Sequence, residues 1–170
     1  VGIADGLLAG VTTVAEHHLT WPTGADGLAI ATATADAAVA LGGRLVFVRG
    51  AARDDPQEAA ARTAEIAAAW LGADPAEDAA VAGVTRGGML QLAVGPAGVH
   101  SDPRETFALL AEVAARYGLR RRTQANEQVD VDIALEKYGR RPLDLLDEWG
   151  WLAPDVTLAH LCDVTAGEID

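Results

Sequence analysis

A glutamate and a histidine in this sequence each stand at the end of a segment that is typical of a β-strand. Glu127 follows the segment 119–126, and His160 lies near the end of the segment 156–161, with helix-forming residues between the two segments. A carboxylate and an imidazole brought together at neighbouring strand ends could carry protons to and from a substrate. The spacing therefore predicts a catalytic pair, in which Glu127 is the proton carrier.

Both residues also have a plainer interpretation. Glu127 stands where a helix begins, and a carboxylate is favourable beside the positive end of a helix dipole. A lone histidine among apolar residues, as His160 is, usually makes its hydrogen bonds within a core. Gln124, which precedes Glu127 by three residues, can donate and accept hydrogen bonds but is a poor ligand for a divalent ion. On these residues alone, the structural and the catalytic interpretation both stay open.

The four histidines share one kind of position, because all fall at or just beyond the end of a predicted strand. His17 and His18 lie just beyond the end of the first strand, and His100 lies in the loop after the third, where it could contact substrate or serve only the loop. Adjacent strand residues face opposite sides, so at most one of His17 and His18 points into a site, and Glu16 shares the face of His18. Random placement would rarely produce this pattern, which favours an enzyme.

The elements that must position these residues alternate between strand and helix. Apolar or β-branched runs predict strands at 11–15, 44–48, 89–94 and 156–161, and Ala-rich or amphipathic segments predict the helices between the strands. The segment 119–126 is predicted as a further strand, which delivers polar side chains to a site. Alternation at this spacing predicts parallel strands joined by right-handed crossovers. In such sheets the carboxyl ends of the strands carry the site.

Several helix starts have recognisable signals. Asp55-Pro56 and Asp102-Pro103 each place a capping side chain and a proline where a helix begins. Thr165 and Glu168 have the spacing of a capping box. The turn-rich stretch 72–88 predicts a surface connection with a short helical piece.

Composition narrows the classes of function. The 170 residues suffice for one domain with a core, and the net charge of −12 argues against nucleic-acid binding, which requires clustered Lys and Arg. The basic run 120–122 could contact a phosphate but more often lies on a solvated strand edge. No apolar run reaches the ~18 residues of a membrane span, so we expect a cytoplasmic protein without membrane contact.

The single cysteine, Cys162, cannot form an internal disulfide, which suits a reducing compartment. Its position just after the last strand makes it a candidate nucleophile, but its apolar neighbours favour a buried structural thiol. The sequence contains neither a Gly-rich phosphate loop of dinucleotide or P-loop spacing nor a Gly-x-Ser-x-Gly elbow.

Five stretches resemble the amidohydrolase superfamily, in the branch of cytosine, guanine and 8-oxoguanine deaminases and triazine hydrolases. They are LAGVTTVAEHH at 8–18, ANE at 125–127, YGRRPL at 138–143, WGWL at 149–152 and LAH at 158–160, in the order of the family. The resemblance implies the central part of a TIM-type (β/α) barrel, about five of its eight units. It also implies one divalent metal, zinc or iron, that activates water for attack on a purine, pyrimidine or triazine ring carbon.

Residue by residue, the resemblance implies a metal ligand at His160 and a proton-shuttling acid at Glu127, in the family pattern His-x-x-Glu. The first position of that pattern is a metal ligand in the family and is Gln124 here, and the histidine that commonly precedes it by two is Arg122. We therefore expect Gln124 and His100 to contact a heterocyclic substrate, and the metal itself could be absent from this chain.

Five strands cannot close an eight-stranded barrel, and the family's first-strand His-x-His and eighth-strand Asp have no counterpart here. We expect residues 1–170 to form a partial barrel domain that is inactive alone. We also expect this domain to belong to a longer protein or to assemble as a homo-oligomer that covers its open face. The alternative is a catalytically inactive, metal-free relative that acts as a binding or assembly protein, which Gln124 supports.

Overall fold

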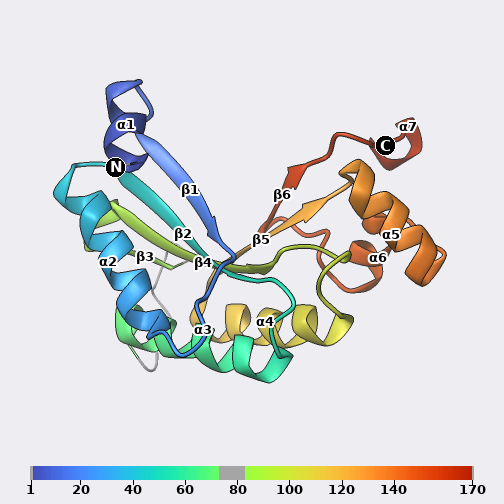
Figure 1. Ribbon diagram of the computed structural model, residues 1–170, viewed down its shortest axis with the longest axis horizontal. Helices are drawn as coiled ribbons and strands as arrows, with labels where there is room; N and C mark the ends of the chain where they lie inside the picture. Colours follow the sequence, from blue (N-terminus) through green and yellow to red (C-terminus); the bar gives the residue numbers. More distant parts are fainter. Residues whose placement is uncertain (1, 73–82, 170) are drawn as a thin grey trace.

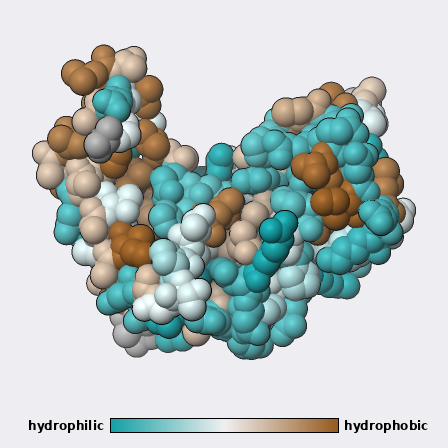
Figure 2. Space-filling view, in the orientation of Figure 1, coloured by the Kyte–Doolittle hydropathy of each residue, from teal (hydrophilic) through white to brown (hydrophobic). Residues whose placement is uncertain are grey.

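The computed structural model describes residues 2–72 and 83–169 and shows one curved sheet with helices on its convex side (Figure 1). Five parallel strands lie side by side in chain order, namely β1 (Thr13–His18), β2 (Arg44–Ala51), β4 (Leu90–Pro96), β5 (Arg120–Ala125) and β6 (Val156–His160). The sheet curls so that β1 and β6 splay apart and the concave face stays open, which gives the hollow between two lobes in Figure 2. The predicted partial (β/α) barrel is therefore confirmed.

Three long helices cover the convex face, and they are α2 (Gly27–Ala40), α3 (Pro56–Leu71) and α4 (Arg104–Tyr117). The helices α5 (Gln128–Tyr138) and α6 (Pro142–Glu148) connect β5 to β6 and lie beside the carboxyl end of β5. Short helices α1 (Gly2–Leu8) and α7 (Ala166–Ile169) flank the sheet near its two outer strands. None of the helices in the described residues combines the length and apolarity that a membrane span requires.

The core lies between the sheet and the helices of the convex face. Alternate strand residues point to this side, as Leu45 and Phe47 do in β2 and Leu92 and Val94 do in β4, and all four are buried. They pack against small and apolar helix residues, among them Ala35 of α2, Ile66 of α3 and Phe107 of α4. This packing fixes which face of each strand is left for the concave side.

The backbones of β4 and β5 come close just beyond their last paired residues, Val94 and Arg121, and a glycine makes this possible. A Cβ atom added at Gly95 would lie 1.5 Å from the carbonyl oxygen of Arg122, so no side chain fits there. The position therefore has a structural reason to be glycine, since only that residue lets two backbones approach so closely.

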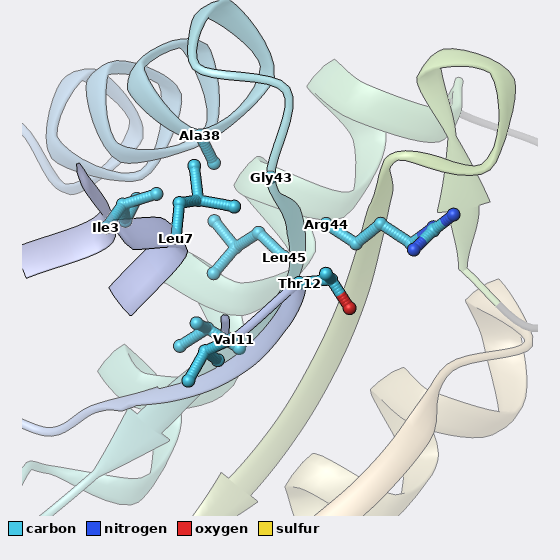
Figure 3. Close-up of a pocket in the computed structure, with 9 residues that line it drawn as sticks. Ile3, Leu7, Val11, Thr12, Ala38, Gly43, Arg44 and Leu45 are labelled. Carbon is cyan, nitrogen blue, oxygen red and sulfur yellow. The ribbon is translucent and has the colours of Figure 1, made fainter. Parts of the chain in front are cut away.

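The helix α1 packs at the opposite end of the sheet. Ile3 and Leu7 point toward Leu45 at the start of β2 and toward Ala38 of α2 (Figure 3). The Cγ2 of Ile3 would lie 3.4 Å from a Cβ at Gly43, which is close packing without a polar partner. This contact is apolar and lies at the amino ends of the strands, so it belongs to the scaffold rather than to a site.

Two of the predicted helix starts are confirmed and one is wrong. The Asp55 side chain caps α3 by accepting the backbone N–H of Glu58 at 3.0 Å, and Glu168 caps α7 by accepting the N–H of Thr165 at 2.8 Å. Asp102 does not cap α4, because Pro103 occupies that position. It is instead fully buried, and its carboxylate accepts the N–H of Arg53 at 3.0 Å and of Ala97 at 3.2 Å. Asp102 thus ties together the loops that follow β2 and β4.

The connection 72–88 differs from its prediction where the structure describes it. Residues 73–82 lie outside the described residues. The remainder forms a two-residue strand, β3 (Val84–Thr85), antiparallel to β4, and a short 3-10 helix, η1 (Arg86–Gly88). Since φ is positive at Arg86, Gly87 and Gly88, η1 is a tight turn that does not test the predicted helical piece, whereas β3 is an addition that the sequence did not predict.

Candidate active site

The structure brings Glu127 and His160 together at the carboxyl edge of the sheet. The Nδ1 atom of His160 lies 3.3 Å from Oε1 of Glu127, and the two side chains are 35% and 40% exposed. Ala125 pairs in register with His160, and the backbone then leaves both strands through left-handed residues, with φ of 54° at Asn126 and 72° at His160. These turns place Glu127 beside the last residue of the neighbouring strand.

Glu127 also begins α5, as the structural interpretation of the sequence proposed. It is the N-cap residue, and its backbone N–H is accepted by Oδ2 of Asp130 at 3.4 Å within a capping box. The cap fixes the backbone of Glu127 relative to β5, and its carboxylate remains accessible at the edge. The two interpretations of this residue therefore describe the same geometry.

Gln124 is the penultimate residue of β5 and faces the concave side. Its neighbour Ala125 belongs to the core under the convex face, and strand residues alternate between faces. The backbone N–H of Gln124 donates to the carbonyl oxygen of Ala97 at 3.0 Å. The side-chain amide of Gln124 makes no hydrogen bond within residues 2–72 and 83–169. The amide is thus available to a ligand on the concave face, and its substrate contact stays a prediction.

His100 lies in the loop after β4 and contacts α5 rather than His160. Its Nδ1 atom meets the carboxylate of Asp130, which is 1% exposed, whereas the His100 side chain is 18% exposed. Sequence reasoning missed Asp130, although its spacing of three residues from Glu127 is the signal of a capping box. Asp130 connects the predicted acid with the predicted substrate contact.

The two adjacent histidines of β1 face opposite sides, as predicted. His18 stacks on Phe47 at 5.7 Å and pairs with Glu16 at 3.0 Å, so both face the helices. His17 faces the concave side, and its Nε2 donates to the carbonyl of Gly95 at 3.1 Å. Burial lowers the pKa of His17, and the nearby positive charge of Arg122 lowers it further. His17 is therefore held neutral on the inner surface.

Two expectations about single residues need correction. Cys162 is exposed, so it is not a buried structural thiol; left-handed φ values at His160 and Leu161 turn the chain out of the sheet before it. Arg121 lies neither on a solvated edge nor at a phosphate site, because it forms a two-point ion pair with Asp155 at 2.7 and 2.9 Å. The predicted strand 11–15 is shifted as well, since β1 extends through Glu16, His17 and His18.

The described residues do not by themselves fit a metal ion. A catalytic zinc site takes three protein ligands and an open position. Within residues 2–72 and 83–169, no three His, Cys, Asp or Glu side chains gather closely enough to hold one, and Nδ1 of His160 is engaged with Glu127. The first position of the pattern His-x-x-Glu holds the weakly ligating amide of Gln124 in place of a histidine. His160 as a metal ligand thus stays a prediction.

Comparison with known proteins identifies relatives by sequence. The chain is 32% identical over 173 residues to an 8-oxoguanine deaminase of Pseudomonas aeruginosa, an alignment covering 99% of this chain and 38% of that protein. It is also 32% identical to an isoxanthopterin deaminase from an unknown prokaryotic organism, covering 99% of this chain and 36% of the relative. The chain thus spans less than two fifths of the length of these relatives. No family model matches it.

Solved structures agree with these relatives. A triazine hydrolase variant superimposes with a TM-score of 0.81 at 28% identity, covering 97% of this chain and 37% of that chain. The atrazine chlorohydrolase TrzN from Arthrobacter aurescens TC1, solved with zinc, has a TM-score of 0.76 at 30% identity over the same shares. A guanine deaminase from C. acetobutylicum, at 15% identity and a TM-score of 0.73, shares the fold. The chain is thus related to the deaminase and triazine hydrolase branch of the amidohydrolase superfamily, and corresponds to part of its barrel.

Proposed function

We propose that this chain supplies the Glu127–His160 part of a hydrolytic active site that removes an amine from a purine, pyrimidine or pteridine ring. The observation that carries the proposal is the 3.3 Å contact between Glu127 and His160 at the carboxyl edge of the sheet. The relatives support it, since they are named as deaminases of 8-oxoguanine and isoxanthopterin. Triazine hydrolases among the structural neighbours extend the class of substrate to triazine rings.

Each residue of the site has a role in this proposal. The carboxylate of Glu127 takes a proton from the attacking water and delivers it to the leaving amine. His160 holds that carboxylate in place, and in a complete site it would be one of the residues that hold a divalent metal, which would supply the activation of water. Gln124 and the imidazole of His100 contact the heterocycle. The described residues lack the remaining ligands, so we propose that the 170 residues alone do not turn over.

A substitution at position 127 distinguishes proton transfer by the carboxylate from its role in capping α5. Glu127→Gln keeps an oxygen for the capping box but cannot carry a proton, so kcat for ammonia release from 8-oxoguanine or isoxanthopterin should fall about 10²- to 10⁴-fold in the whole protein. Glu136→Gln, on the exposed face of α5, is the matched control and should leave kcat unchanged. Equal activity of the Glu127→Gln variant and the wild type would reject the role of this acid.

A second candidate function rests on Gln124 in place of a histidine and on the absence of a ligand trio within the described residues. It is a metal-free binding or assembly protein that keeps the barrel and has lost hydrolysis. Metal analysis of the purified whole protein distinguishes the two candidates. One zinc or iron per chain with release of ammonia supports the enzyme, whereas binding of 8-oxoguanine without metal and without ammonia supports the alternative.

A further inference from the structure

The two strand ends that carry the proposed pair leave the sheet through left-handed residues. The backbone φ is 54° at Asn126, just after β5, and it is 72° and 55° at His160 and Leu161, where β6 ends. Residues other than glycine, asparagine and aspartate rarely adopt this conformation, so the backbone of His160 and Leu161 is strained. Such strain persists only where the surrounding structure fixes it. The position of His160 therefore depends on contacts that hold the chain around the end of β6.

The backbone around Asn126 supplies two of these contacts. The carbonyl oxygen of Asn126 accepts the N–H of Asp163 at 2.8 Å, and the carbonyl oxygen of Ala125 accepts the N–H of Leu161 at 2.9 Å. Both bonds follow the last residues that are paired between the strands, Ala125 and His160. They tie the chain after His160 to the residues that lead into Glu127.

The side chain of Asn126 adds two further bonds to the same segment. Its Nδ2 donates to the carbonyl oxygen of Asp163 at 3.3 Å and to Oε1 of Glu168 at 3.2 Å. Both partners are acceptors, so the amide must present its nitrogen to them. Asn126 is fully buried, and the loss of its amide would leave these acceptors without that donor. Asparagine thus serves this position twice, because it tolerates the left-handed conformation and it bridges to the chain beyond β6.

We propose that Asn126 is a positioning residue that sets the separation of Glu127 and His160. It turns the chain from β5 into Glu127, and it binds the segment that follows His160, so both members of the pair are placed by one buried side chain and its backbone. The inference rests on the proposed function for the role of the pair. Asn126 acts through its neighbour Glu127, whose Oε1 lies 3.3 Å from Nδ1 of His160.

The first test needs no turnover. In crystal structures of the whole protein, the wild type should show Glu127 and His160 within hydrogen-bond distance, and Asn126→Ala should separate them. Alanine removes the amide and disfavours the left-handed conformation, whereas glycine adopts that conformation readily and removes only the amide. Asn126→Gly should therefore widen the contact by less, and it tests the amide bridge even if Asn126→Ala does not fold. An unchanged contact in every variant that folds would overturn the positioning role.

The second test uses kinetics of the whole protein with 8-oxoguanine. If Glu127 is displaced while Gln124 and His100 still contact the ring, kcat falls and KM does not change. We expect Asn126→Ala to lower kcat about 10²-fold, which is the scale of a misplacement of about 1 Å, and Asn126→Gly to lower it less. A loss confined to KM, or wild-type kcat in both variants, would contradict the proposal.

Thr63→Ala is the matched control for a loss of stability. It removes a hydrogen bond from another fully buried side chain, which donates to the carbonyl oxygen of Ala59 at 2.7 Å within α3. This variant should lower Tm and leave kcat unchanged.

A double-mutant cycle shows whether Asn126 acts through the acid. In the Glu127→Gln background, Asn126→Ala should change kcat by less than about twofold, because the group that it positions no longer carries a proton. An equal fall of kcat in both backgrounds would mean that Asn126 acts independently of Glu127, and the positioning role would be wrong. Absence of ammonia release by the wild type would instead count against the proposed function and leave the crystallographic test standing.

Discussion

Glu127 both begins a helix, through its backbone, and presents a carboxylate at the open edge of the sheet. Its backbone begins α5, where Asp130 accepts its N–H, and its carboxylate lies 3.3 Å from His160 at the open edge. A helix start fixes the direction of the chain at this point, and the left-handed turn at Asn126 brings that start out of β5 beside β6. The structural role of the residue is thus the means by which the carboxylate reaches the site.

The identity of residue 124 decides how strongly the site can hold a metal, which gives a prediction at the residue scale. Gln124→His places an imidazole on the concave face, one residue from the pair formed by Ala125 and His160. Imidazole is a good zinc ligand and an amide is a poor one, so zinc affinity of the variant should rise by more than the roughly tenfold effect of an outer-shell partner. Competition with a chromophoric chelator measures the affinity.

A histidine placed at the neighbouring strand position, which faces the helices, serves as the control. Thr123→His adds an imidazole to the buried side of β5 and should not raise zinc affinity, although its stability must be checked first. Equal zinc binding by wild type and Gln124→His would show that position 124 does not face the metal site. His160→Ala in the Gln124→His background should then remove the gain if His160 is the second ligand.

At the scale of elements, the carboxylate of Glu168 links the segment after β6 to the starts of α5 and α6 by hydrogen bonds. Glu168 accepts hydrogen bonds from Nε of Arg141 at 2.8 Å and from Nδ2 of Asn126 at 3.2 Å, and it also receives the hydroxyl of Thr165 at 2.9 Å. These donors lower the pKa of Glu168 from 4.5 to about 2, with the Arg141 hydrogen bond as the largest cause. The cluster joins α7 to the residues that flank Glu127.

The stability that Glu168 contributes should depend on pH in a defined direction. Its folded pKa is lowered, so the contribution is fully present above the ordinary pKa of 4.5 and is lost as pH falls through 4.5 toward 2. Glu168→Gln should lower the free energy of unfolding at pH 7 by about 1.5–3 kcal/mol, the range for hydrogen bonds to charged groups. Urea titrations at several pH values should show the gap to wild type narrowing below pH 4.5. A gap of constant size, or an equal loss in the exposed Glu112→Gln control, would contradict this assignment.

Elements were predictable from the sequence where a repeated pattern specifies them. Strands β2 and β4 carry apolar runs long enough to recognise, and the spacing of Asp55 and of Thr165 marks two helix starts. The strand β3 has two residues, which are too few to show any periodicity. It forms because it pairs with β4 by antiparallel backbone hydrogen bonds. Asp102 has the same Asp-Pro signal as Asp55, but tertiary contacts to two loops outweighed the local cap.

The site was predictable only in part for a related reason. Glu127 and His160 end neighbouring strands, so the crossover rule alone brings them to one edge. The contact of His100 with Asp130 joins a loop to a helix from the next unit, and no local spacing encodes it. Exposure of Cys162 follows from two left-handed residues before it, a backbone choice that apolar neighbours in the sequence conceal.

At the scale of the whole molecule, the sheet is curved but not closed. Within the described residues, β1 pairs only with β2 and β6 pairs only with β5, so each outer strand has one side without a strand partner. Unpaired edges of this kind template association with another chain. The relatives are more than twice as long as this chain, and the shared part covers 38% of the 8-oxoguanine deaminase.

We therefore predict that the 170-residue chain, when produced by itself, self-associates through its outer strands. Sedimentation velocity over a range of concentrations should show dimers or larger species rather than a single monomer peak. Thr13→Lys, on the exposed start of β1, should weaken association because a charged side chain on an edge strand opposes pairing, whereas Glu112→Lys on α4 should have no effect. A concentration-independent monomer would mean that the concave face and both edges are stable in water, and the homo-oligomer expected from the sequence would then be wrong.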